Sequence, residues 1–307
     1  MGFDKDSDTP AFQPTINIRG RLYDFDTPWV MGIVNITPDS FYDGSRTPVS
    51  NETAIRDRVA RMREEGADCL DLGGYSTRPG AEEISVEEEW RRLATGLKAT
   101  REVWPEAIIS IDTFRADIAR RAVKEFGADI INDVSGGTLD PAMFDTVAEL
   151  KVPYILMHMR GTPANMQSLT DYNDVTADVL SDLAFKTQKL RLKGVCDIIL
   201  DPGFGFSKTV DQNYRLLDDL EEFAKTGLPV LAGMSRKSMI WRPLGITPDD
   251  SLSGTVALHM VALMKGASII RVHDAAAARQ SVDVFKLLKK NSRPLSEKTV
   301  IKITDRV

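Results

Sequence analysis

Short apolar runs and longer amphipathic segments alternate along the chain. Eight short apolar runs recur at roughly even spacing, and the segments between them are long enough for helices. Several of these segments open on Asp, Ser or Asn, which are favoured as the first residue of a helix. The runs are VMGIVN, CLDLGG, IISID, DIIND, PYILMH, DIILD, PVLAGMS and SIIRVH. Helices are predicted over about 51–66, 86–101, 115–126, 141–150, 173–193, 211–225, 253–265 and 275–290.

This alternation predicts an α/β fold with a parallel sheet. The runs are apolar at successive positions, as strands covered by helices must be. Eight repeats without a Pro/Gly linker or a break in composition favour a closed (β/α)8 TIM barrel over a doubly wound sheet. We therefore predict a single domain, a barrel over residues 16–290.

Short segments flank the predicted barrel. Residues 1–15 are rich in Asp, Thr and Pro and are predicted to form a flexible leader. The stretch INIRGRLYDFDTP alternates and turns at Arg19-Gly20, which predicts a small hairpin before the first barrel strand. The polar tail 291–307 is compatible with a frayed end or a small edge strand and carries no predicted function.

Composition excludes several classes of partner. The 307 residues carry a formal net charge of -6 and no run of Lys or Arg, so nucleic acid is not an expected partner. No apolar stretch approaches the roughly 20 residues that span a bilayer, and the acidic N-terminus lacks the apolar core of a secretory signal. Cys69 and Cys196 lack CxxC spacing and lie in or beside apolar runs, so both are predicted to be buried free thiols. These features predict a cytoplasmic protein that has no membrane partner.

Polar residues stand at the carboxyl ends of the predicted strands. Asp112, Asn132 and Asp201 end three different runs, and Lys237 follows another. In a (β/α)8 barrel these ends face the active-site mouth. A single such residue is readily explained as a cap of the following helix or turn. The convergence of several favours a binding site.

Arg271 and His273 form a candidate anion site. They are two positions apart on a strand, so their side chains leave on the same side, and Asp274-Ala-Ala-Ala begins a helix directly afterwards. Arginine supplies a forked donor, histidine a second donor, and the helix N-terminus free amides. The alternative is an arginine paired with a neighbouring carboxylate beside a core histidine.

The carboxylates and the amide indicate a different ligand. Asp112, Asn132 and Asp201 can accept hydrogen bonds, and Asn132 can also donate. Together they suit a flat heterocycle with amino and amide edges. An aminopyrimidinone ring has edges of this kind.

Eight strings occur in a fixed order along the chain. They are MGIVNITPDSF (31–41), GGYSTRPGA (73–81), SIDT (110–113), INDVSGG (131–137), LMHM (156–159), DPGFGF (201–206), GMSRKS (233–238) and RVHD (271–274). As an ordered set they resemble the dihydropteroate synthase family, and the resemblance runs from about Pro28 to Leu288. It implies a (β/α)8 barrel that joins 6-hydroxymethyl-7,8-dihydropterin diphosphate to 4-aminobenzoate, with Mg2+ present, and releases pyrophosphate.

The resemblance also implies roles for individual residues. The pterin would be bound by Asp112, Asn132, Met157, Asp201, Phe206, Gly233 and Lys237. The diphosphate would be held by Asn35, Arg78, Arg271 and His273, with Asn35 also in reach of the metal. The implied catalytic residues are Asp112, Asp201, Lys237, Arg271 and His273. Because Mg2+ binds largely through phosphate oxygens and water, no carboxylate cage is expected. For Met157 and Phe206, packing in an apolar core is the alternative explanation.

Two loops would complete the site, from Thr37 to about Val49 and from Ser76 to about Glu83. In the family they act as lids, although ordinary turns after a strand remain the alternative. The 4-aminobenzoate would be bound by Phe41, Thr77, Arg78, Pro79 and Ser238. Its carboxylate would lie at the start of the helix after the seventh strand, near Ser238.

The implied mechanism is SN1-like. Diphosphate would leave first and give a cation delocalised into the dihydropterin ring, which the carboxylates of Asp112 and Asp201 would stabilise. Arg271, His273 and Mg2+ would stabilise the departing diphosphate, and the aromatic amine would then attack the methylene carbon. No general base is strictly needed, which agrees with a sequence in which no Ser/His/Asp or Cys/His nucleophile set stands out.

Two departures from the family pattern bear on the loops. Tyr75 stands where many members have Glu, and SMIWRPLGITPDDS follows Lys237 in place of the more usual Phe-Ile-Gly sequence. Three alternatives stay open: a methyltetrahydrofolate-dependent methyltransferase barrel, a Schiff-base aldolase with Lys237 as nucleophile, and a catalytically silent barrel that binds pterin. The resemblance further implies a homodimer formed through helices of the later repeats.

Overall fold

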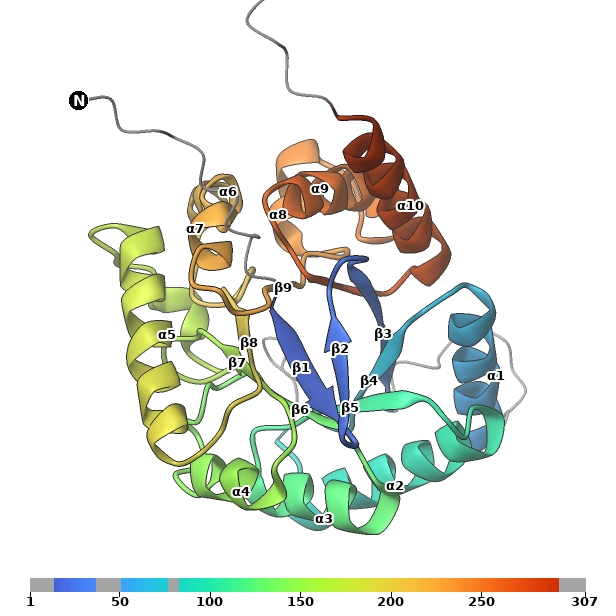
Figure 1. Ribbon diagram of the computed structural model, residues 1–307. Helices are drawn as coiled ribbons and strands as arrows, with labels where there is room; N and C mark the ends of the chain where they lie inside the picture. The colour runs from blue at the N-terminus through green and yellow to red at the C-terminus, as the bar shows by residue number, and fades with distance from the viewer. Residues whose placement is uncertain (1–13, 37–50, 77–82, 293–307) are drawn as a thin grey trace, which may run out of the picture.

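Eight parallel strands form the centre of the protein, and helices surround them (Figure 1). The structure, a computed structural model, describes residues 14–36, 51–76 and 83–292. Hydrogen-bonded neighbours follow the order β8-β7-β6-β5-β4-β3-β10-β9. The strands are β3 Trp29–Asn35, β4 Cys69–Gly73, β5 Ile108–Asp112, β6 Ile130–Asp133, β7 Tyr154–Met157, β8 Ile198–Asp201, β9 Leu231–Ala232 and β10 Ile269–Val272. The predicted (β/α)8 architecture is confirmed.

The ring closes between its two outermost strands, β8 and β9. A single parallel bridge joins Leu200 to Val230, and the backbone N–H of Leu200 donates to the carbonyl of Pro229 at 2.9 Å. Proline has no backbone N–H and can only accept here. This seam is therefore held by fewer hydrogen bonds than the joins between the longer strands.

The helices lie between successive strands, as the sequence pattern predicts. Within the described residues they are α1 Asn51–Glu64, α2 Val86–Val103, α3 Ala116–Phe126, α4 Met143–Leu150, α5 Val175–Leu192, α6 Val210–Asp218, α7 Leu220–Ala224, α8 Ser238–Leu244, α9 Leu252–Met264 and α10 Ala275–Asn291, with short 3-10 turns at Met166–Ser168 and Asp249–Ser251. None of them is long and apolar enough to cross a membrane.

Local chemistry explains where several helices begin. Asp174 accepts from the backbone N–H groups of Thr176 and Ala177 at the start of α5. Thr209 and Gln212 form a reciprocal capping box at the start of α6. The pattern expected one helix over 211–225, but the structure has two, because α6 ends before Asp219 and α7 begins after it. The seven-residue helix α8 is absent from the helices that the hydrophobic pattern predicts, and Pro243 inside it explains the weak signal; the family resemblance did imply a helix that starts near Ser238.

The predicted hairpin is also confirmed. Strands β1 Thr15–Ile18 and β2 Arg21–Asp24 pair antiparallel around a turn at Arg19 and Gly20. Both turn residues have positive φ, 53° and 80°, which suits the twist of a two-residue hairpin loop. Glycine reaches such a φ at little cost.

The hairpin covers the amino end of the barrel. Ile16 and Ile18 are 0% and 2% exposed, and they pack against apolar side chains near the starts of the barrel strands. Those side chains are Trp29, Met31, Cys69, Ile130, Ile155, Ile199, Leu231 and Ile269. The guanidinium of Arg19 anchors the turn by donating to both carboxylate oxygens of Asp129, at 2.6 and 2.8 Å. The amino end is thus closed, and the carboxyl end carries the polar residues.

The two cysteines differ in their surroundings. Cys69 is a buried free thiol in β4, as predicted, and burial raises its pKa well above the usual value. The prediction that Cys196 is buried was wrong, because this free thiol is exposed. It precedes the first residue of β8 by two positions, in the irregular segment between α5 and β8, so the apolar run that follows it in sequence does not cover it.

The flanking segments of the prediction are described only in part. Thr15 already begins β1, so regular structure starts one residue before the predicted boundary, and α10 reaches Asn291. Residues 1–13 of the predicted leader and residues 293–307 of the predicted tail lie outside the described residues.

Candidate active site

The polar strand ends predicted from sequence lie together at the carboxyl end of the barrel. Asp112 closes β5 and is in register with Asn132 of β6, while Met157 closes β7 in register with Asp201 of β8. Arg271 lies in β10. Parallel pairing therefore aligns residues that lie far apart in the chain.

Arg271 is the centre of a partly buried ion-pair network. Its Nε lies 2.6 Å from Oδ2 of Asp71, and its Nη2 lies 2.7 Å from Oδ2 of Asp112. The same oxygen of Asp71 accepts from Nδ2 of Asn132 at 2.9 Å. Arg271 thus has the carboxylate partners that the sequence left as an alternative to an anion role. Its placement beside Asp112 and Asn132 keeps it within the predicted site.

Asp71 was missed as a site residue by sequence reasoning. It lies inside β4, two positions before the strand ends, so it carried no strand-end signal. Its side chain is fully buried, and its Oδ1 has no hydrogen-bond partner among the described residues. A charged residue in the middle of an apolar run was the available clue, because buried charges are rare unless they are paired.

Burial raises the pKa of two carboxylates in the site, Asp112 and Asp201. It raises the pKa of Asp112 to about 7, although the neighbouring Arg271 acts in the opposite direction. Burial also raises the pKa of Asp201, against the effect of Lys237 and of a hydrogen bond from the backbone N–H of Gly203 at 2.7 Å. Desolvation disfavours the charged form of both groups.

Lys237 lies against the loop that follows β8. Its Nζ donates to the carbonyl of Phe204 and lies 4.7 Å from the centre of the Phe206 ring. Burial lowers its pKa to about 8. A Cβ placed on Gly233 would lie 3.9 Å from both Lys237 Nζ and Arg271 Cβ, so the predicted Gly233 lies beside both residues.

A buried lysine, Lys208, holds the loop after β8 and was not predicted. Its Nζ donates to the carbonyls of Gly203 and Phe206, each at 3.0 Å, and to Nδ1 of His158 at 3.1 Å. Three acceptors match the three N–H donors of an ammonium group. Gly203 has φ 75°, and a Cβ there would lie 2.0 Å from the carbonyl oxygen of His158. Only glycine fits this close approach.

Met157 and Phe206 lie on the apolar side of the site. Met157 is buried in a small cluster, and the partly buried Phe206 packs against that cluster. The other members are Val134, Met159, Met166, Phe114 and Leu139. Core packing accounts for these contacts, and the predicted pterin contact stays a prediction.

Further polar residues bond to His273 and Asp274 at the predicted anion site. Ser235, which follows β9, bonds both the backbone N–H and the Nδ1 of His273, each at 3.1 Å. Asp274 accepts two hydrogen bonds from Arg236, at 2.8 Å each, and does not cap α10. Nη2 of Arg58 donates to the His273 carbonyl at 2.5 Å. Sequence reasoning assigned no role to Ser235, Arg236 or Arg58.

The remaining predicted residues are placed in part. Asn35 closes β3 and is half-buried, and Ser238 is the first residue of α8, directly after Lys237. Phe41, Thr77, Arg78 and Pro79 lie outside the described residues, as does most of each predicted lid loop. Tyr75 packs edge-on against Phe114 at 5.1 Å, with the guanidinium of Arg115 5.3 Å from its ring centre.

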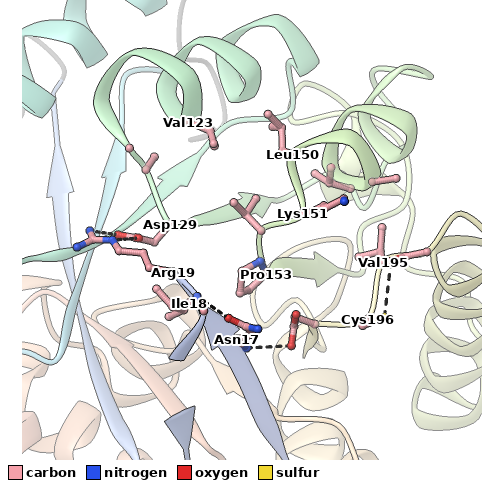
Figure 2. A pocket seen from close by; sticks show the side chains of 18 of the residues that line it. Asn17, Ile18, Arg19, Val123, Asp129, Leu150, Lys151, Pro153, Val195 and Cys196 are labelled. Carbon is pink, nitrogen blue, oxygen red and sulfur yellow. Dashed lines mark hydrogen bonds and ion pairs between the residues drawn. The ribbon is translucent and has the colours of Figure 1, made fainter. Parts of the chain in front are cut away.

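A pocket of about 840 Å³ lies at the opposite end of the barrel (Figure 2). The hairpin and the turns after α3, α4 and α5 line it. Arg19 points at Asp129 there, and Lys193 pairs with Asp145, so these charges already have partners. None of the predicted site residues lines this pocket. Because barrel enzymes carry their chemistry at the carboxyl ends of the strands, the polar network there is the candidate active site.

Comparisons with known proteins show what the chain is similar to. A family model described as "Pterin binding enzyme" matches residues 31–273. The chain is 43% identical over 281 residues to a dihydropteroate synthase of Synechocystis sp., covering 90% of this chain and 96% of the relative. Among solved structures it is similar to the Xanthomonas albilineans dihydropteroate synthase with 4-aminobenzoic acid, with a TM-score of 0.81, 39% identity, and coverage of 91% and 100% of the two chains. The Yersinia pestis dihydropteroate synthase in a sulfonamide drug complex gives a TM-score of 0.83, 35% identity, and coverage of 91% and 100%.

Proposed function

The chain belongs to the dihydropteroate synthases of the pterin-binding enzyme family, and on that premise we propose how its own residues carry out the reaction. The substrates would be 6-hydroxymethyl-7,8-dihydropterin diphosphate and 4-aminobenzoate, and the products 7,8-dihydropteroate and pyrophosphate. In support, the similar structures include one with 4-aminobenzoic acid and one with 7,8-dihydropteroate.

The observation that carries the proposal is a pair of buried acceptors without partners. Oδ1 of Asn132 and Oδ1 of Asp71 have no hydrogen bond among the described residues. An unpaired buried acceptor is costly, so a ligand with N–H groups would be bound strongly there. A pterin ring presents such groups on its amino-pyrimidinone edge. Asp201 would accept from that edge as well, and Lys237 would donate to a ring nitrogen or to the ring carbonyl.

The reaction would proceed by loss of diphosphate before the new bond forms. The bond between the pterin methylene carbon and the diphosphate oxygen breaks, and the electron pair leaves with the diphosphate. The carboxylates of Asp112 and Asp201 would stabilise the positive charge that develops in the ring. The amine of 4-aminobenzoate then forms the carbon–nitrogen bond and releases a proton to solvent.

The diphosphate would be held at the edge formed by β3 and β10. These two strands pair directly, so Asn35 at the end of β3 lies on the same edge as Arg271 and His273. Arg78 would add a further cation from the loop outside the described residues. Because Arg271 already bonds Asp71 and Asp112, its part would be to donate through its remaining N–H groups.

Mg2+ is a proposed partner of the same edge. In residues 14–36, 51–76 and 83–292 no group of three or more His, Cys, Asp or Glu could hold a metal ion. The oxygen of Asn35 suits a hard cation that otherwise takes phosphate and water oxygens, so we propose Asn35 as its protein ligand. When bound, the ion would offset the negative charge of the diphosphate.

The 4-aminobenzoate would be bound beside the methylene carbon. Ser238 at the start of α8 would receive its carboxylate. Phe41, Thr77, Arg78 and Pro79 stay proposed contacts from the two loops outside the described residues.

A homodimer and a cytoplasmic location are further parts of the proposal. Apolar side chains are exposed on α9 and α10, which pack against each other (Figure 1). They are Val261, Met264, Val284, Leu287 and Leu288, with 39% to 63% of each exposed. Neighbouring exposed apolar residues favour a protein interface. Met264→Glu together with Leu287→Glu should convert the dimer to monomers in light scattering, and a wild-type monomer would remove the proposal.

The proposed cytoplasmic location is supported by the cysteines. The free thiols of Cys69 and Cys196 suit a reducing compartment.

The direct test supplies pterin diphosphate, 4-aminobenzoate and Mg2+ and measures pyrophosphate and dihydropteroate together. Equal amounts of both products are expected, and dihydropteroate should disappear without the aminobenzoate. Asp201→Asn should lose pterin binding because an acceptor becomes a donor. Arg271→Ala should weaken diphosphate binding. Pterin binding without turnover would instead identify a silent barrel.

A further inference from the structure

Ser235 and His273 are joined by two contacts across the carboxyl end of the barrel. Ser235 follows β9 in the turn that leads to Lys237, and it is 3% exposed. His273 directly follows β10. The Ser235 hydroxyl lies 3.1 Å from the backbone N of His273 and 3.1 Å from Nδ1 of its ring.

The number of donors and acceptors at Ser235 determines the direction of each bond. A hydroxyl has one hydrogen and two acceptor lone pairs. The backbone N–H of His273 can only donate, so Oγ accepts there. If Nδ1 also donated, the hydroxyl hydrogen would have no acceptor, because no other partner of Oγ is found among the described residues. The hydroxyl therefore donates to Nδ1, and Nδ1 carries no hydrogen.

The ring is neutral at pH 7. Burial and the nearby Arg271 lower the pKa of His273 to about 4, with smaller contributions of the same sign from Arg58 and Arg236 and an opposing one from Asp274. A neutral imidazole carries one N–H. With Nδ1 accepting, that hydrogen is on Nε2, which has no hydrogen-bond partner in the described part of the chain.

We propose that Ser235 is a positioning residue that fixes His273 as the Nε2–H tautomer, so that the imidazole presents a neutral donor to the oxygen of the departing diphosphate. The geometric part depends only on Ser235 and His273. The assignment of the diphosphate as recipient rests on the proposed function. A neutral donor binds the developing charge without the cost of burying another cation beside Arg271 and Arg236.

The test is nitrogen-15 NMR of the histidine rings, which reports directly which nitrogen bears hydrogen. The chain has three histidines, His158, His259 and His273, so His273→Gln identifies the relevant signals by their loss. His158 is an internal reference below pH 7, where Lys208 is charged and can only donate to its Nδ1, so the hydrogen of His158 is on Nε2. Wild-type His273 is expected to show hydrogen on Nε2 alone. A hydrogen on Nδ1 in the wild type would overturn the inference without any variant.

Ser235→Ala tests the role of the Ser235 hydroxyl. Loss of the hydroxyl should allow both tautomers of His273 and lower kcat/KM for pterin diphosphate by roughly tenfold, with KM for 4-aminobenzoate unchanged. Ser251→Ala removes another buried serine hydroxyl, which bonds only the Pro248 carbonyl among the described residues. It should change neither the tautomer of His273 nor kcat/KM. A pure Nε2–H tautomer in Ser235→Ala would contradict the role of the hydroxyl.

Failure of this inference and failure of the proposed function give different results. An Nε2–H signal in a wild type that makes no dihydropteroate would leave the tautomer standing and remove its role toward diphosphate. Normal synthesis with hydrogen on Nδ1 would keep the function and remove the positioning role of Ser235.

Discussion

Oδ2 of Asp71 lies 2.6 Å from Nε of Arg271, a residue 200 positions later in the chain. The same oxygen accepts from Nδ2 of Asn132 at 2.9 Å. A carboxylate can only accept, so Asn132 must turn its NH2 group toward Asp71 and its Oδ1 away. Asp71 thereby orients one cation and one amide of the proposed pterin pocket, although it was not predicted as a site residue.

Asp71→Asn should damage both stability and binding. The variant leaves Arg271 with Asp112 as its one carboxylate partner, and the loss of the charged hydrogen bond to Asp71 should cost about 1–3 kcal/mol in the free energy of unfolding. Urea unfolding measures this change, and calorimetric titration with the pterin substrate should show lost binding. Asp117→Asn, on an exposed pair at 4.0 Å, is the control and should leave both unchanged. An unaltered pterin affinity in Asp71→Asn would mean that Asn132 keeps its orientation without this carboxylate.

The value of kcat/KM for pterin diphosphate should depend on pH as a bell-shaped curve, with its maximum between about pH 7 and about pH 8. Below its pKa of about 7, Asp112 becomes neutral and can no longer stabilise positive charge in the ring. Above its pKa of about 8, Lys237 loses its positive charge, so its hydrogen bond to a ring carbonyl is no longer charge-assisted and weakens. Steady-state rates at saturating 4-aminobenzoate, taken across this range, report both groups in the free enzyme.

Lys237→Arg provides the control for the alkaline limb. A guanidinium stays charged throughout the range, so the residual activity of this variant should not fall above pH 8. An alkaline limb that persists would assign it to another group, for which Lys208, with a pKa lowered to about 7 by burial, is the nearest candidate in the site.

Ser207 combines backbone strain with two hydrogen bonds. Its φ is 52°, in the left-handed region, and its hydroxyl accepts from the backbone N–H of Arg160 at 2.8 Å and donates to the Arg160 carbonyl at 2.9 Å. Ser207→Ala should lower the free energy of unfolding by about 1–3 kcal/mol because both bonds are lost and the strain remains. Ser207→Gly should lose about 1 kcal/mol less, since glycine adopts this φ freely. Equilibrium unfolding in urea checks the order, and a glycine variant less stable than the alanine variant would contradict it.

Ile18→Ala should destabilise the barrel from its amino end. The side chain is 2% exposed and packs in the layer that closes this end, so its loss should cost about 2–5 kcal/mol. Leu22→Ala lies on the same hairpin but is 68% exposed, and it should change stability by no more than about 0.5 kcal/mol. Thermal unfolding of both variants makes the comparison. Equal effects would show that the hairpin does not close the barrel.

The secondary structure was predictable because each element carries its own local signal. The strand ends at Asp112 and Asp201 and the hairpin turn at Arg19-Gly20 appear in the structure as expected. The errors lie where the local signal was weak or misleading. The hydrophobic pattern showed no helix at α8, which contains Pro243, and Cys196 is exposed although the run that follows it is apolar.

The sequence by itself determined the order of strands and helices, the family, and which polar residues lie at the carboxyl end of the barrel. Only the tertiary structure decided how those residues pair. Arg271 on β10 reaches past β3 to bond Asp71 on β4 and Asp112 on β5, and Ser235 bonds a ring from the next strand. The physical reason is that side chains alternate along a strand, so the sequence specifies the side on which each residue lies. Which residues meet across the barrel depends on how the closed ring aligns separate strands.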